Sequence, residues 1–269
     1  MLRRDRWLAG GALLGAIALC WAWIVPMALD MYGAMDGAAK WMMTAQWDFT
    51  HLALLFAMWT VMMAGMMLPS AAPTLLLYGC VIRKSPDNAR TAAHINAFAG
   101  GYLVVWTVFS LVATMAQRLL AERLLLSPMM EANDPLFGGG LLMLAGVYQF
   151  TPAKRACLAF CRSPAEFLTR HWKPGPGGGF YLGLANGLYC LGCCWALMAL
   201  FIAFGVMNLW AMIGLATVVL GEKILRQGEA IGRIAGAACL IAAVLVVVSP
   251  SFADRIIPAP TTMTEMNGQ

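Results

Sequence analysis

Charged residues are scarce in this chain: Asp, Glu, Lys and Arg make up 12% of its 269 residues, whereas a soluble domain has about 25%. Hydrophobic residues make up 61%, and the mean hydropathy is +0.73. The chain therefore has too few polar side chains to cover a water-facing surface. This excludes an ordinary cytosolic enzyme, a disordered chain and a nucleic-acid-binding protein.

Histidine is also rare, with 3 residues, and there are 13 acidic residues, yet the chain contains 20 Met and 8 Cys. Sulfur-containing side chains thus outnumber those that carry imidazole or carboxylate. Two interpretations fit this bias. The chain handles a soft metal ion, for which sulfur is the preferred ligand, or it uses Met and Cys as apolar packing residues.

Several segments are apolar enough to cross a bilayer, for which a helix needs about 20 residues. The sequence predicts seven spans, at residues 7–27, 51–79, 94–117, 136–150, 180–201, 204–220 and 231–248. We expect an all-α fold, a polytopic transmembrane helix bundle that forms one domain over residues 1–250. Residues 28–50 are too polar to cross and predict an outer interfacial segment, and residues 251–269 predict a disordered C-terminal tail.

The positions of Lys and Arg predict the orientation, because cytoplasmic loops carry an excess of both. With the N-terminus inside and, after seven spans, the C-terminus outside, 14 of the 18 cations fall on the inner side. The net charge of +5 is then a topology signal. The inner cations are Arg3, Arg4, Arg6, Arg83, Lys84, Arg90, Lys154, Arg155, Arg162, Arg170, Lys173, Lys223, Arg226 and Arg233. Glu222 and Lys223 end the sixth span, where we expect them to pair at the membrane interface.

The fifth expected span contains three cysteines, Cys190, Cys193 and Cys194. At about 100° per residue they lie within an arc of about 100° on one helix face. Three thiolates on one face can begin a site for Cu(I), Zn(II) or a related soft ion. The alternative is that Cys serves only as a small residue for helix packing.

A second pair, Cys157 and Cys161, is spaced for one face of another helix and is flanked by Lys154, Arg155 and Arg162. Nearby cations favour the thiolate, which is the metal-binding form. Cys157 follows the short fourth span, whereas Cys190 lies about 15 Å along the fifth. A shared site requires either that the fifth span begins later, after the glycine-rich stretch 175–179, or that the Cys157 helix folds back into the bundle. Otherwise there are two sites in series.

The second expected span carries a row of sulfur atoms. On a helical wheel His51, Met58, Met62 and Met66 share one face and extend roughly 22 Å along the axis. Thioethers below a His at the outer mouth suit Cu(I), because neutral soft ligands hold it without a fixed charge. Met is also a common packing residue, so ordinary bundle core is the competing interpretation.

Several motifs together resemble one bacterial family, described as predicted metal-binding integral membrane proteins of unknown function. They are WTVMMAGMMLP at residues 59–69, YQFTPAK at 148–154, and GLYCLGCCWALM at 187–198. Cys157 and the CRSP stretch at 161–164 complete them, and the likeness covers about residues 47–248. The resemblance implies a bacterial inner (plasma) membrane protein, and it supports the five clustered cysteines as the metal motif.

We therefore predict a membrane protein that binds a soft metal ion, with Cu(I) favoured and Zn(II) as the alternative, and that delivers, handles or transports it. Its expected partners are the lipid bilayer, the metal ion and either a metallochaperone or a membrane complex, with no nucleic acid. Cys190 and Cys193 form a C-x-x-C spacing, so a membrane thiol-disulfide oxidoreductase is an alternative. A structural accessory subunit of a membrane complex is another. The sequence favours a binding function over an enzymatic one but does not decide between them.

Overall fold

The computed structural model describes residues 3–31, 48–85, 90–126 and 132–249, and its regular elements in these ranges are helices. One isolated bridge joins Leu126 to Ala132. The expected all-α fold is confirmed. The helices are α1 (Arg3–Met31), α3 (Phe49–Arg83), α4 (Thr91–Glu122), α5 (Pro135–Gln149), α6 (Pro152–Arg162), α7 (Pro164–His171), α8 (Gly175–Ala199), α9 (Phe201–Phe204), α10 (Leu209–Ile224) and α11 (Gly228–Val248).

Side-chain caps explain where several of these helices begin. Asp48 accepts a hydrogen bond from the His51 backbone N–H at 2.9 Å and starts α3. Thr151 accepts one from Lys154 N–H at 3.3 Å and starts α6. Asn208 accepts one from Ala211 N–H at 3.1 Å and starts α10. Each cap satisfies a backbone donor that has no partner inside the helix.

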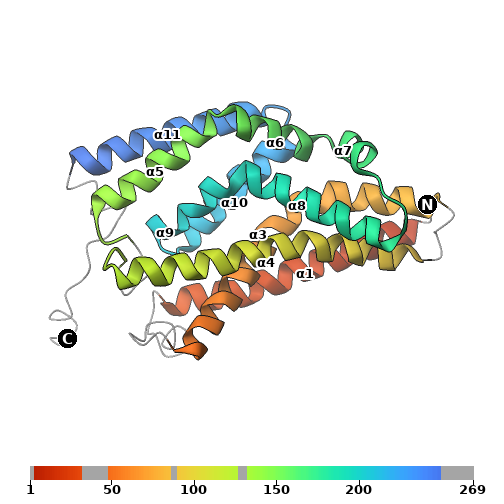
Figure 1. Ribbon diagram of the computed structural model, residues 1–269, viewed down its shortest axis with the longest axis horizontal. Coiled ribbons are helices and arrows are strands. Elements are labelled where there is room, and N and C mark those ends of the chain that lie inside the picture. Colours follow the sequence, from red (N-terminus) through yellow and green to blue (C-terminus); the bar gives the residue numbers. More distant parts are fainter. Residues whose placement is uncertain (1–2, 32–47, 86–89, 127–131, 250–269) are drawn as a thin grey trace.

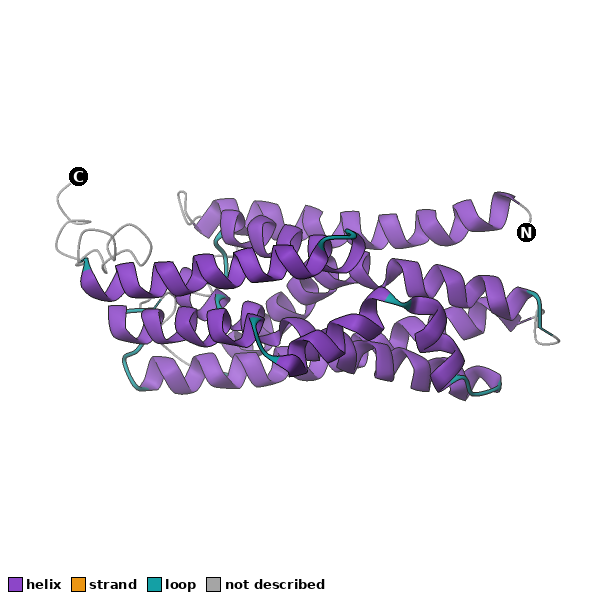
Figure 2. Cartoon of the chain, turned by 90° about the horizontal axis from the view of Figure 1, so that it is seen from above, coloured by secondary structure: helices purple, strands orange, loops and turns teal. Residues whose placement is uncertain are grey.

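The long helices α1, α3 and α4 run side by side, and α8 packs along α4 (Figure 1). Glycine permits the α4–α8 contact, since a Cβ on Gly183 would overlap the backbone carbonyl of Phe98. Helices α5 and α11 pack on each other as a second pair, and α6 lies against α8 near the middle of the molecule (Figures 1 and 2). Small residues therefore set the spacing of helices whose surfaces are otherwise apolar.

Among the described residues, five helical segments are long and apolar enough to cross a membrane: four within α1, α3, α4 and α11, and one that runs through α8 and α9. The pair α5 and α6 makes a sixth candidate if it counts as one span, bent by 64°. All seven expected spans correspond to helices, but α10 has only 16 residues. Exposed apolar side chains on α4 and α11, such as Val108, Val112, Ile234 and Ile241, are compatible with a lipid environment. The number seven and the orientation stay predictions.

Two sequence predictions fall mainly on residues without a described structure. The expected interfacial segment, 28–50, lies for the most part outside the described residues, and the expected tail, 251–269, lies wholly outside them. At the edges of the first segment, α1 continues to Met31 and α3 already begins at Phe49. The main buried core draws residues from α1, α3, α4, α5, α6, α8, α9, α10 and α11.

Candidate metal centre

Helix α8 places three thiols inside the bundle. Cys190, Cys193 and Cys194 are exposed by 2%, 1% and 0%. The Cys193 and Cys194 thiols both donate to the backbone carbonyl oxygen of Cys190, at 3.0 and 2.9 Å. They point back along the helix toward Cys190, as side chains spaced by three and four residues do. The three thiols thus share one buried face.

Helix α6 brings the other two cysteines to the same place. Cys161 packs against the core that contains Cys190, Cys193 and Cys194, and it lies near Cys193. Cys157 rests on Gly192, where a Cβ would come within 2.7 Å of its Sγ atom. The five thiols therefore form one group, which we call the sulfur cluster (Cys157, Cys161, Cys190, Cys193 and Cys194). Of the arrangements open from the sequence, the helix that carries Cys157 folds back into the bundle, whereas α8 begins at Gly175 and therefore does not begin after the glycine-rich stretch.

The break between α5 and α6 makes this meeting possible. α5 ends at Gln149, Pro152 sits in the first turn of α6, and the two helices are bent by 64°. Tyr148 at the end of α5 donates from its hydroxyl to the Gly192 carbonyl at 2.5 Å. Its ring also packs edge-on against Trp195 at 5.1 Å. These two contacts hold the bend between α5 and α6 against α8, beside the cysteines.

One end of the sulfur cluster is surrounded by polar groups from three other helices. The Cys190 Sγ atom lies 2.8 Å from the Lys223 ammonium nitrogen and 3.0 Å from the Tyr102 hydroxyl. Lys223 also donates to the Ser70 hydroxyl at 3.1 Å. Ser70 and Tyr102 both donate to the Met67 carbonyl, at 2.8 and 2.9 Å. Helices α3, α4, α8 and α10 meet at this point.

The expected interfacial pair of Glu222 with Lys223 is wrong, because both residues are buried and each has other partners. Glu222, 0% exposed, accepts from Lys154 at 2.7 Å and from Gln149 at 3.3 Å. Lys154 is 2% exposed and also bonds to Gln149. Successive residues of a helix point about 100° apart, so these neighbours reach different helices. Two cations assigned to the inner side, Lys154 and Lys223, are thus interior groups.

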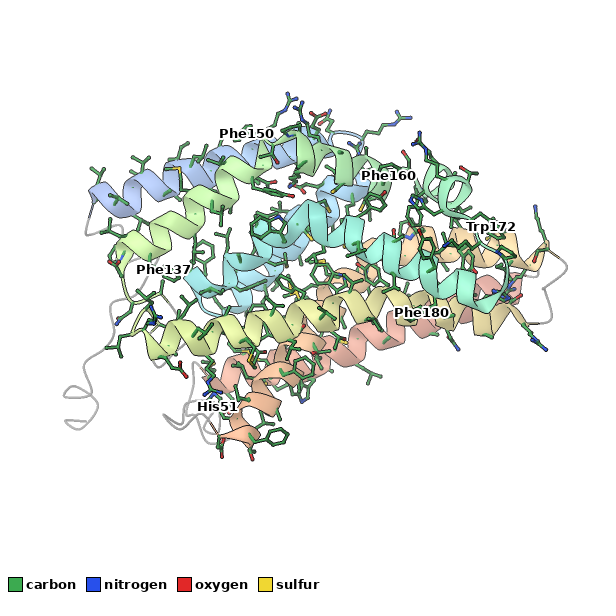
Figure 3. All side chains as sticks on the ribbon, in the orientation of Figure 1. His51, Phe137, Phe150, Phe160, Trp172 and Phe180 are labelled. Carbon is green, nitrogen blue, oxygen red and sulfur yellow. The ribbon has the colours of Figure 1, made fainter. Side chains whose placement is uncertain are left out.

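The predicted thioether row is buried but separate from the sulfur cluster over most of its length. All four side chains are buried: His51 is 3% exposed, Met58 and Met62 are each 1% exposed, and Met66 is 4% exposed. His51 lies near the start of α3, at the edge of the bundle (Figure 3). At 1.5 Å per residue it is roughly 28 Å from Ser70. Only the Met66 end approaches Cys190. Met63 and Met67 are buried as well, so burial alone does not separate ligands from packing.

The donor set of the sulfur cluster is soft, and all eight cysteines of the chain are free thiols. Within the described parts of the chain, no three His, Cys, Asp or Glu side chains already converge in a geometry that holds a metal ion. Cys161 on α6 does lie near Cys193 on α8. A pair of opposed thiolates is the smallest ligand set for a soft monovalent ion.

Sequence reasoning missed the polar groups beside the thiols. Lys223, Lys154 and Glu222 are ionisable residues in apolar helices, and that alone is a signal of function. It was overlooked because they lie near helix ends. Glycines of α11 that are spaced by four residues lie against these groups. A Cβ on Gly232 would come within 2.9 Å of Glu222 Oε1, and one on Gly236 within 2.7 Å of Gln149 Cβ. These glycines make room for the buried ion pair.

The fold and the site together define an all-helical protein with a buried cluster of soft donors. The chain belongs to the family PpoB2, described as copper chaperone, whose model matches residues 56–246. That range contains the whole sulfur cluster and the three methionines of the row, but not His51. It supports the metal-related part of the resemblance drawn from the sequence and a copper-related function. No curated protein and no solved structure matches the chain.

Proposed function

We propose that this protein binds Cu(I) as cargo in the sulfur cluster and hands it to a partner protein in or at a membrane. The observation that carries the proposal is the meeting of α6 and α8, which gathers five thiols from two separated motifs. Apolar packing alone gives no reason for such a gathering beside a buried lysine. Membership of the copper chaperone family points to the same metal.

Cu(I) fits this ligand set better than Zn(II) does. Thiolates and thioethers are the ligands that Cu(I) prefers, whereas structural Zn(II) is almost always held by four ligands in a tetrahedron. Cys161 on α6 lies near Cys193 on the neighbouring helix α8, so a two-sulfur Cu(I) site can form between these helices. Cys157, Cys190 and Cys194 are then the further thiols through which the ion is exchanged.

The row formed by His51, Met58, Met62 and Met66 belongs to the same proposal. These residues occupy one face of α3, and the helix leads from His51 toward Ser70, beside Cys190. Neutral thioethers bind Cu(I) more weakly than thiolates do, so an ion entering near His51 gains affinity as it approaches the cysteines. The row is proposed as the entry route.

A location in the bacterial inner membrane follows from the family resemblance and the apolar helices. With the N-terminus in the cytoplasm, the His51 end of α3 faces outward. The α6 end of the sulfur cluster then lies nearer the cytoplasm, where thiols stay reduced. The partner that takes the ion is accordingly a cytoplasmic metallochaperone or a membrane complex.

Metal content tests this function directly. The purified protein in detergent is loaded with Cu(I) under reducing, anaerobic conditions, and bound copper is measured per chain. Cys161→Ala with Cys193→Ala is expected to lose most of the copper. Cys80→Ala with Cys239→Ala is the matched control, because these cysteines lie outside the cluster, and it should keep the copper of the wild type.

Two results would replace this function with another. Equal copper in the wild type and in the Cys161/Cys193 variant would overturn metal binding by the cluster and favour an accessory role within a complex. A disulfide between Cys190 and Cys193 that forms and is reduced in step with a substrate thiol, detected by alkylation and mass spectrometry, would favour an oxidoreductase. X-ray absorption of the loaded protein should show a sulfur-only first shell around Cu(I).

A further inference from the structure

We infer that Lys223 is the residue that sets the metal selectivity of the sulfur cluster, because its fixed positive charge favours a monovalent ion over a divalent one. This inference rests on the proposed function. It concerns the choice between Cu(I) and Zn(II), for which the cysteines alone are suitable ligands.

Lys223 is held among sulfur atoms. It is 7% exposed, and its ammonium nitrogen lies 2.8 Å from Cys190 Sγ and 3.1 Å from Ser70 Oγ. Cys193 and Cys194 lie on the same helix face as Cys190, and their thiols donate to the Cys190 carbonyl. One charged side chain from α10 therefore lies against the face of α8 that carries three of the five thiols.

The adjacent carboxylate does not neutralise this charge. Glu222 is paired with Lys154 at 2.7 Å, and the side chains of that pair are 0% and 3% exposed. This pair is neutral as a unit. The positive charge of Lys223 consequently remains inside the sulfur cluster, where thiolates are its counter-charge.

Counting charges shows why this matters. Two thiolates, one ammonium and Cu(I) sum to zero, whereas Zn(II) on the same two thiolates leaves a net charge of +1 and needs a third ionised thiol to become neutral. Net charge is costly in a buried, apolar site. The repulsion between the ammonium and the bound ion is also proportional to the charge of that ion. Lys223 therefore penalises Zn(II) more strongly than Cu(I).

The test measures the affinities of the full-length protein for Cu(I) and for Zn(II), each by competition with a chromogenic chelator. Lys223→Gln keeps a hydrogen-bond donor but removes the charge, and it should lower the ratio of Cu(I) to Zn(II) affinity by at least about tenfold. Lys223→Arg keeps the charge and should preserve the ratio. Arg233→Gln is the control for the loss of one cation, because Arg233 lies exposed on α11 and pairs with Glu229.

The outcomes separate this inference from the proposed function. An unchanged ratio in Lys223→Gln overturns the inference, even when the Cys161/Cys193 variant has lost its copper. Equal copper in the wild type and in that cysteine variant overturns both. If Lys223→Gln does not fold, Lys223→Met supplies the same comparison. A wild-type protein that binds Zn(II) as tightly as Cu(I) refutes the inference without any variant.

Discussion

Lys154 and Glu222 form an ion pair of 2.7 Å in the interior of the bundle, with side chains 3% and 0% exposed. The pair joins α6, which carries Cys157 and Cys161, to α10, which carries Lys223. It therefore connects the two sides of the sulfur cluster. Gly228 and Gly232 of α11 leave the space that the Glu222 side chain and backbone occupy.

Breaking this pair should be costly. Glu222→Gln leaves the Lys154 ammonium buried without its counter-charge, and we expect a loss of about 3–5 kcal/mol in the free energy of unfolding. The double variant Lys154→Met with Glu222→Leu should recover much of it, since two apolar residues need no counter-charge. Denaturant unfolding in detergent measures both. Glu229→Gln, which breaks the exposed pair with Arg233, should change stability by less than about 1 kcal/mol. A similar loss in both single variants would refute the special role of the buried pair.

Gly192 should be needed for the contact between α6 and α8. In Gly192→Ala the new Cβ comes within 2.7 Å of Cys157 Sγ, so the Cys157 thiol has to leave its position in the sulfur cluster. We expect a loss of about 1–3 kcal/mol in stability and a fall in bound copper. Gly214→Ala is the matched control on α10, because nothing lies within 4 Å of its Cβ position. It should stabilise the helix by up to about 1 kcal/mol and leave copper unchanged. Full copper in Gly192→Ala would show that the helix contact is not required.

The methionine row can be tested apart from its packing role. Leu has nearly the volume of Met, so Met58→Leu with Met62→Leu and Met66→Leu should cost less than about 1.5 kcal/mol per site. We expect slower copper loading with an unchanged final content at the cysteines. Met63→Leu with Met67→Leu, buried on the same helix, is the control and should load at the wild-type rate. Stopped-flow measurement of Cu(I) uptake gives the rates. Equal rates in all three proteins would leave the row as core packing.

The orientation follows from charge and can be measured with reporters. Fusions that are active only on one side of the membrane should place the N-terminus and the loop that contains Arg83 and Lys84 in the cytoplasm. Lys154 and Lys223 are interior groups and do not count as loop cations. Without them the predicted topology has 12 inner cations and 4 outer ones. The asymmetry persists, so the expectation is unchanged. A cytoplasmic reporter signal from the loop that contains Arg118 and Arg123 would contradict it.

Several features of the site could be predicted from spacing within one helix. The common face of Cys190, Cys193 and Cys194 follows from helical geometry, and their burial confirms it. The packing of α6, with Cys157 and Cys161, against α8 could not be predicted, because it depends on the 64° bend after Gln149. The partners of Lys223 lie 33 and 153 residues away in the sequence. No local pattern indicates which distant helix a side chain will meet.

The sequence by itself determined the helical class, the apolar segments and the faces of single helices, because these depend on composition and on a period of 3.6 residues. Only the tertiary structure decided that five cysteines from two motifs form one cluster and that Lys223 lies within it. It also decided that Glu222 pairs with Lys154 and not with Lys223. The physical reason is that charges buried in apolar surroundings must find partners, and the packing of α5, α6, α8 and α10 determines which partners are within reach.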